Sequence, residues 1–177
     1  MSAETATVDN RSEKLPIWTK IAYGSGDLGT AITAALRAFF LLFFLTDVAR
    51  LSPAAAGTIL LINRLWDAVN DPVVGWLSDR TATRWGRRRP WIIIGAIPFG
   101  LLFFMIWLVP PFGQTGLFIY YVVIALLLDT AYTVINVPYT SLTPELTRDY
   151  DERTSLNSYR AAFSIGGALV AAVVHPL

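Results

Sequence analysis

The stretch LINRLWDAVNDPVVGWLSDR, residues 61–80, has the apolar content of a membrane helix but carries Arg64, Asp67 and Asp71 at its centre. Each of these charges costs about 2.5–3.5 kcal/mol at the middle of a membrane-crossing helix. The nine Ile, Leu and Val residues between positions 57 and 78 together contribute only about 4 kcal/mol in the favourable direction. A spacing of three and four residues places the three charges on one helix face. That face must therefore lie against protein or a water-filled cavity.

This charged face offers oxygen ligands to a small cation. Asn70 lies at its edge beside Asp71, and Pro72 lacks the N–H that would otherwise bond the carbonyl oxygen of Ala68. Carboxylate, amide and carbonyl oxygens are the ligands that small hard cations prefer. The segment predicts a site for Na⁺ at Asp67 and Asp71, or a pair of carboxylates that carries H⁺. The alternative is a packed ion-pair network with Arg64 that only orients helices.

The rest of the chain has the composition of a membrane protein. Hydrophobic residues make up 54% of its 177 residues and charged residues 15%, whereas soluble domains average about 25% charged. A membrane-crossing helix needs about 20 mostly apolar residues. Five such spans are predicted, over residues 21–45, 54–77, 91–109, 117–142 and from about 158 to 174. The predicted fold is an all-α, polytopic membrane helix bundle.

Basic residues alternate between the connecting segments. The amino-terminal tail and the second and fourth connections hold eleven: Arg11, Lys14, Lys20, Arg80, Arg84, Arg87, Arg88, Arg89, Arg148, Arg153 and Arg160. The first connection holds Arg50 alone and the third holds none. Because basic residues concentrate in cytoplasmic loops, the amino terminus is predicted to be cytoplasmic. Residues 1–16 form a polar tail and residues 17–177 a helix bundle in the cell membrane, either the inner or the plasma membrane.

Several classes of protein are disfavoured by what the sequence lacks. The chain has no cysteine, a net charge of +1 and one histidine, His175, without a nearby nucleophile. No phosphate-binding glycine loop or His/Cys metal motif is present. We therefore expect neither an enzyme nor a nucleic-acid-binding protein, and no cofactor besides a coupling ion. An odd number of spans that ends in an apolar run predicts a fragment of a longer protein.

Polar residues also follow one face of the fourth span, spaced four, three and four apart: Asp129, Thr133, Asn136 and Thr140. Pro138 frees the carbonyl oxygen of Val134 and is expected to bend the helix. Together with the phenols of Tyr132 and Tyr139, this face suits a polyhydroxylated ligand such as a sugar. Polar packing between helices, common for Ser, Thr and Asn in membranes, is the alternative.

The second connection, residues 75–90, contains features beyond its basic charge. Gly75 would permit a close helix approach, Gly86 indicates a turn, and Asp79 can pair with the following arginines in an interdomain charge latch. Positive charge on the cytoplasmic side alone explains the arginines, but it explains neither the acid nor the turn.

These segments resemble a known family. A stretched form of the loop signature of the major facilitator superfamily is found in Gly75, Asp79, Arg80, Gly86, Arg87 and Arg88. The glycoside–pentoside–hexuronide:cation symporters, which include melibiose and glucuronide permeases, are similar in YGSGDLG (23–29), RLWDAVNDP (64–72), TRWGRRRPWIIIG (83–95) and YTVINVPYTSLTPELT (132–147).

The resemblance implies a twelve-helix transporter of two six-helix halves, of which these are the first five helices. It places the coupling cation at Asp67 and Asp71 with Thr133 beside them, and it places Arg160 in the sugar cavity between the halves. Two departures from the melibiose type occur: Thr30 and Ala31 replace a Lys-Asp pair, and Asn136 and Thr140 replace an acid and a tryptophan. A sugar other than melibiose is therefore expected.

The sequence thus predicts a symporter in the lipid bilayer that couples sugar or glycoside movement to Na⁺ or H⁺. Its expected partners are these solutes and ions and the missing carboxy-terminal helices of the same transporter. The predicted cation ligands are Asp67, Asp71, Asn70 and Thr133. The predicted substrate ligands are Asp27, Arg64, Tyr132, Asn136, Thr140 and Arg160. The alternatives are an uncoupled facilitator or exporter of another small solute, and a truncated membrane protein with an assembly role.

Overall fold

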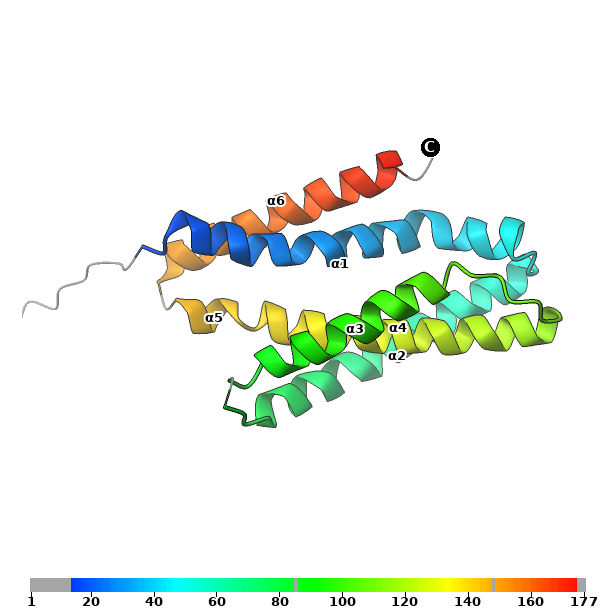
Figure 1. Ribbon diagram of the computed structural model, residues 1–177, viewed down its shortest axis with the longest axis horizontal. Helices are drawn as coiled ribbons and strands as arrows, with labels where there is room; N and C mark the ends of the chain where they lie inside the picture. The colour runs from blue at the N-terminus through cyan, green and yellow to red at the C-terminus, as the bar shows by residue number, and fades with distance from the viewer. Residues whose placement is uncertain (1–13, 85, 148, 175–177) are drawn as a thin grey trace, which may run out of the picture.

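The computed structural model describes residues 14–84, 86–147 and 149–174, and these residues form helices joined by short connections (Figure 1). Most of the predicted polar tail, together with Arg148 and His175, lies outside the described residues. The elements in chain order are α1 (Ile17–Phe43), the π-helical turn η1 (Phe44–Val48), α2 (Pro53–Arg80), α3 (Arg89–Met105), α4 (Gln114–Thr140), the short α5 (Thr143–Leu146) and α6 (Tyr150–Val174). Each of the five predicted spans corresponds to one long helix, so the all-α prediction is confirmed.

The helix boundaries follow from local chemistry. Ser52 caps α2 by accepting a hydrogen bond from the backbone N–H of Ala55, 3.2 Å away, and Pro53 takes the first helical position, where no N–H is needed. Pro90 lies in the first turn of α3 for the same reason. By contrast, α2 continues through Pro72 and α4 through Pro138.

Two stretches in the described part of the chain are long and apolar enough to cross a membrane: Ile17–Val48 and Gln114–Leu146. Helix α3 is equally apolar but has only 17 residues. Helix α2 has 28 residues, and the charges at its centre lower its mean hydropathy. Length and composition therefore support crossing most directly for α1 and α4.

The helices form two groups. Helix α1 lies alongside α6, while α4 packs against both α2 and α3 (Figure 1). The α1–α6 contact is close at Gly24, where an added Cβ would lie 2.8 Å from the ring of Phe163 and 3.1 Å from the backbone carbonyl of Tyr159. At Gly167 of α6, an added Cβ would lie 3.0 Å from the carbonyl oxygen of Leu28. Small residues of this kind let membrane helices approach closely.

Substituting Gly24→Ala is expected to destabilise the full-length protein by about 1–3 kcal/mol, because the added methyl group overpacks the contact with α6. Gly29→Ala in the same helix is the matched control, since its added Cβ meets nothing within 4 Å. The control should be neutral or slightly stabilising, as alanine favours helix. Thermal unfolding of both variants in detergent checks this, and equal melting temperatures would contradict the close approach.

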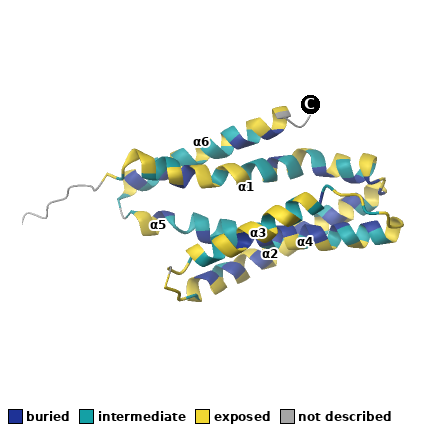
Figure 2. Ribbon diagram, viewed as in Figure 1, coloured by how far each residue is buried: buried dark blue, intermediate teal, exposed yellow. Residues whose placement is uncertain are grey.

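The buried apolar core lies towards one end of the bundle (Figure 2). It is built where η1, the start of α2, the end of α3 and the first half of α4 meet, with Leu45, Ile59, Ile106 and Tyr121 among its most buried members. Towards the other end, polar contacts join the helices. Many apolar side chains on the outer faces are exposed, such as Ile97 at 79%, as expected for surfaces that face lipid.

Candidate functional site

A hydrogen bond joins the two helices on which the cation site was predicted. The hydroxyl group of Thr133 in α4 donates to Oδ1 of Asp71 in α2 over 2.8 Å. Thr133 is almost fully buried, whereas Asp71 is exposed in this chain and Asp67 is half-buried. The α2–α4 packing therefore brings Asp71 and Thr133 together as expected, with one carboxylate oxygen accessible from outside the bundle.

Buried amides flank this pair. Asn70 and Asn63 of α2 are each 6% exposed. Within the described residues, the amide nitrogen of Asn70 and the amide oxygen of Asn63 have no hydrogen-bond partner. An unpartnered buried polar atom costs about 1–3 kcal/mol. The free oxygen of Asn63 can bind a cation or accept a hydrogen bond from a ligand, whereas the free nitrogen of Asn70 is a donor and cannot bind a cation. The described residues contain no group of three or more His, Cys, Asp or Glu that could hold a metal ion, and the donor set is two carboxylates with neutral oxygens.

A second charged pair links α1 to α4. A guanidinium nitrogen of Arg37 lies 2.5 Å from Oδ1 of Asp129, and their side chains are 17% and 6% exposed. The Nε of Arg37 and the Oδ2 of Asp129 have no hydrogen-bond partner in the described structure. The alternative of a packed ion-pair network between Arg64 and the aspartates is not seen, because Arg64 forms no ion pair among the described residues. The interhelical guanidinium comes from α1 instead.

A third polar cluster joins α1, α4 and α6. Arg160 of α6 donates to Oδ2 of Asp27 in α1 from both Nε and Nη2, each at 3.1 Å. The same guanidinium lies 5.0 Å from the ring centroid of Tyr139, which stacks on Tyr23 with 5.0 Å between ring centroids. Two of the predicted substrate residues, Asp27 and Arg160, are thus in direct contact.

The rings of this cluster also fasten α1 to the end of α4. The hydroxyl group of Tyr139 donates to the backbone oxygen of Tyr23, and the hydroxyl group of Tyr23 donates to the backbone oxygen of Tyr139 over 3.2 Å. Tyr23 also shares a 2.7 Å hydrogen bond with the hydroxyl group of Thr143. Tyr139 is therefore committed to a structural contact between helices.

Of the remaining predicted substrate residues, Arg64 lies on α2 and is exposed, and the other three lie on α4 and are less closely joined to these clusters. The ring of Tyr132 packs against Phe99 of α3 with 6.2 Å between centroids. The hydroxyl group of Thr140 donates to the carbonyl oxygen of Val137 in its own helix. Asn136 is half-buried. Ligand contacts by these three residues stay a prediction.

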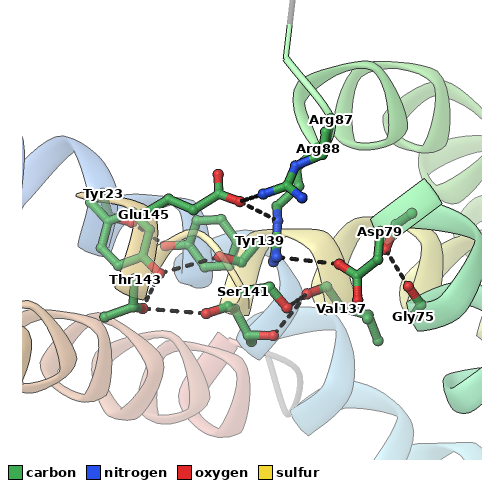
Figure 3. Close-up of polar contacts among 12 residues, drawn as sticks. Tyr23, Gly75, Asp79, Arg87, Arg88, Val137, Tyr139, Ser141, Thr143 and Glu145 are labelled. Carbon is green, nitrogen blue, oxygen red and sulfur yellow. Dashed lines mark hydrogen bonds and ion pairs between the residues drawn. The ribbon is translucent and has the colours of Figure 1, made fainter. Parts of the chain in front are cut away.

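The arginine loop pairs with acids at the ends of two helices, as Figure 3 shows. Arg88 lies between Asp79 at the end of α2, 3.3 Å away, and Glu145 of α5, 2.9 Å away. Arg87 pairs with the same carboxylate of Glu145 at 3.2 Å. Asp79 therefore pairs with one of the arginines that follow it, but this contact lies within the bundle, and a latch between domains stays a prediction. The sequence interpretation missed Glu145, although this acid lies in the quoted segment YTVINVPYTSLTPELT.

The other loop residues have separate roles. Gly86 has a φ of 95°, which favours glycine, so the turn predicted there is confirmed. Arg80 stacks on Trp76 of its own helix, 3.9 Å from the ring centroid. The expectation for Gly75 is wrong, since an added Cβ would lie 3.7 Å from Val137, an ordinary contact. Close α3–α4 packing depends instead on Gly95, whose Cβ would lie 2.9 Å from Val134 and Ile135.

The first turn of α6, which precedes its apolar stretch, is tied to the start of α1. The ammonium group of Lys20 lies 2.8 Å from Glu152, and the backbone N–H of Leu15 donates to the same carboxylate oxygen. The hydrogen bond from Lys20, followed by that from Leu15, lowers the pKa of Glu152. The carboxyl group of Glu152 is therefore held in its charged form, in which it accepts hydrogen bonds from both Lys20 and Leu15.

The sequence of residues 22–177 matches the family described as MFS/sugar transport protein. The chain belongs to this family. Among the relatives of this MFS chain, an uncharacterized symporter of Synechocystis sp. is 55% identical over 172 residues, covering 94% of the chain and 32% of the relative. The family predicted from the loop and helix segments is thereby confirmed.

Two further relatives differ in the solute that their names state. A sodium-dependent lysophosphatidylcholine symporter of Danio rerio is 40% identical over 165 residues, covering 93% of this MFS chain and 31% of the relative. A putative glycoside/cation symporter of Escherichia coli is 39% identical over 165 residues, covering 93% of the chain and 36% of the relative. The chain spans about one third of the length of the relatives it matches.

Proposed function

We propose that this MFS chain forms the amino-terminal part of a cation-coupled symporter, with Na⁺ or H⁺ as the coupling ion. The observation that carries the proposal is the hydrogen bond between Thr133 and Asp71, formed beside the buried amide of Asn70. This contact supplies a carboxylate oxygen from α2 and a hydroxyl oxygen from α4 at one place. Asn70, whose amide oxygen is the further ligand of the proposal, directly precedes Asp71 in α2. Asp67, one helical turn before Asp71, completes the set. Two carboxylates with neutral ligands suit a monovalent ion that must bind and leave in every cycle.

The coupling ion changes the charge at the α2–α4 contact. Without it, Asp67 and Asp71 hold two negative charges on one helix face, and like charges at this spacing repel. Binding Na⁺ or H⁺ removes one charge and favours closer packing of α2 on α4. Since Asp129 on α4 is paired with Arg37 on α1, a shift of α4 is transmitted to α1. This connects the ion site with the helix that carries Asp27.

The solute site of the proposal lies along α1, α4 and α6 and takes a sugar or glycoside. Its polar groups are those of Asp27 and Arg160, with Asn136 and Thr140 further along α4. A charged pair beside stacked tyrosine rings offers both hydrogen bonds and an aromatic face to a sugar ring. Arg64 and Tyr132 belong to the same proposed set. The name of the Escherichia coli glycoside/cation symporter supports this class of solute.

A lysophospholipid is the second candidate solute, because a relative of similar identity is named as a lysophosphatidylcholine symporter. We place the whole transporter in the inner or plasma membrane, with the tail and the arginine loop in the cytoplasm. The excess of basic residues in these two segments supports that orientation.

Uptake by the full-length protein in proteoliposomes tests the proposal. Radiolabelled monosaccharides, glycosides and lysophosphatidylcholine are each supplied under an imposed Na⁺ gradient, an imposed proton gradient, or neither. We expect a sugar or glycoside to accumulate above its external concentration under one gradient alone. Equilibration without accumulation under every gradient would identify a facilitator and refute coupling. Accumulation of lysophosphatidylcholine alone would establish the second solute.

A further inference from the structure

A cavity of about 630 Å³ lies between α3, α4 and the loop that follows α2. Its walls are mostly apolar, including Ile94, Pro98 and Leu102 of α3 and Leu127 and Val134 of α4. The volume is in the range of about 300–1,000 Å³ found for small-molecule sites. This groove is separate from the contacts that form the proposed cation and solute sites.

The length of the groove matches one leaflet of a bilayer. Its lining on α3 runs from Pro90 to Leu102, which corresponds to about 18 Å at 1.5 Å per residue. The hydrocarbon core of a bilayer is about 30 Å thick, so one leaflet contributes about half of that. A chain lying in the groove would extend from the arginine loop to about the membrane centre.

The loop end of the groove is basic. Arg87 and Arg88 are committed to Glu145 and Asp79, and Arg80 is stacked on Trp76. Arg84 and Arg89 are exposed and form no ion pair in the described part of the chain. They directly follow and precede two residues of the groove wall, Thr83 and Pro90. Two uncompensated positive charges therefore stand at the mouth of an apolar groove.

The same end carries an indole at the depth where aromatic residues gather in membrane proteins. Trp91 lines the groove and donates from its ring N–H to the hydroxyl group of Thr81 over 2.9 Å. Tryptophan is enriched at the membrane–water interface. The interface then lies at the level of Trp91, with Arg84 and Arg89 at headgroup height and Leu102 deep in the hydrocarbon.

We propose that this groove binds an anionic phospholipid of the leaflet facing the arginine loop. One acyl chain lies along α3 and α4, and Arg84 and Arg89 contact the headgroup phosphate. Basic pockets between membrane helices are known to select such headgroups. A zwitterionic lipid fills the groove equally well but leaves the positive charge of the loop uncompensated. Charge complementarity therefore favours the anionic lipid.

A second cavity provides an internal control. It has a volume of about 370 Å³ and is lined by apolar groups that include Ile119, Val123 and Ile124 of α4. The connection at this end, residues 106–113, contains no basic residue. It can accept an acyl chain. Its own connection offers no partner for an anionic headgroup, and the neighbouring connection at this end supplies one arginine, Arg50, whose backbone oxygen accepts a hydrogen bond from Gln114, in place of the two exposed arginines of the first groove.

The test titrates the full-length protein in detergent with palmitoyl-oleoyl phosphatidylglycerol or palmitoyl-oleoyl phosphatidylcholine and counts bound lipids by native mass spectrometry. The variants are R84Q/R89Q, Ile94→Trp, which fills the groove, and Val123→Trp, which fills the control cavity. We expect R84Q/R89Q to weaken phosphatidylglycerol binding about 30-fold and to leave phosphatidylcholine unchanged. Ile94→Trp should weaken binding of both lipids, and Val123→Trp should leave phosphatidylglycerol binding as in the unsubstituted protein.

Three results would overturn the proposal. The first is equal affinity of the unsubstituted protein for the two lipids. The second is unchanged phosphatidylglycerol binding in both R84Q/R89Q and Ile94→Trp. The third is that Ile94→Trp lowers the melting temperature in lipid-free detergent, or dissociates an oligomer, while phosphatidylglycerol does not bind the unsubstituted protein. That result would show the groove to be covered by the rest of the polypeptide or by a second copy.

Discussion

Replacing Asp71 by Asn in the full-length protein is expected to abolish uptake stimulated by a Na⁺ or proton gradient while leaving the fold intact. Asparagine has nearly the shape of aspartate, and its amide oxygen still accepts the hydrogen bond that Thr133 now donates to Asp71. The variant loses the negative charge that the coupling ion neutralises. Truncating one partner of a buried charge pair costs about 2–5 kcal/mol. Asp71 is exposed in the described chain, so the lower end of this range applies and cation affinity should fall about 30-fold.

Gradient-driven uptake and direct cation binding are measured for Asp71→Asn and for a control variant, Asp47→Asn. Asp47 is exposed in η1, and among the described residues its carboxylate accepts a hydrogen bond from the neighbouring Thr46, so its loss should leave both quantities unchanged. Thermal unfolding should give equal melting temperatures for the two variants. Cation dependence that survives in Asp71→Asn, in a folded protein, would refute the assignment of the cation site.

Asp129→Ala is expected to lower the free energy of unfolding by about 3–5 kcal/mol, since it leaves the guanidinium group of Arg37 buried without a counterion. This pair is the most buried of the ion pairs inside the membrane region of the described structure. The double variant Arg37→Met/Asp129→Leu should recover most of the loss, because replacing both charges by apolar groups removes the desolvation penalty. Thermal unfolding in detergent provides the measurement.

The control for this prediction is Arg87→Ala, which removes the exposed guanidinium group that contacts Glu145. An exposed pair of this kind contributes about 0–1 kcal/mol. Equal losses for Asp129→Ala and Arg87→Ala would show that Arg37 is hydrated in the folded protein. A double variant as unstable as Asp129→Ala would show that the Arg37 position requires a charge.

The helices and one interhelical contact could be predicted from the sequence. Long apolar runs separated by basic segments determine the spans, because each span must satisfy its own backbone hydrogen bonds in lipid. The contact between Asp71 and Thr133 was expected from the family resemblance, not from spacing. The spans depend on physics that acts within one helix, whereas the partner of Asp71 on α4 depends on how the two helices pack.

The choice of partner among several charges could not be predicted from spacing. Arg64 lies on the same helix face as Asp67, yet the guanidinium group that pairs within the bundle belongs to Arg37 of α1 and meets Asp129 of α4. Sequence spacing indicates which side chains are neighbours on one helix, whereas pairing between helices depends on how the helices cross. Glu145 was missed for the same reason: it lies on α5, far along the sequence from Arg87 and Arg88, so spacing gave no indication that it pairs with them. Gly24 of YGSGDLG was a usable signal for the α1–α6 contact, whereas Gly29 of the same segment meets nothing within 4 Å.

The polar centre of α2 also has a consequence for how the protein is made. A helix that carries Arg64, Asp67 and Asp71 gains too little from its apolar residues to enter lipid alone, and its hydroxyl partner Thr133 lies on α4. The last residue of α4 follows the end of α2 by 60 positions. At about 5–20 residues per second, α2 waits several seconds during synthesis before α4 is complete. The insertion machinery must shelter α2 over that interval, so the same side chains that are proposed to bind the coupling ion also delay the entry of their helix into the membrane.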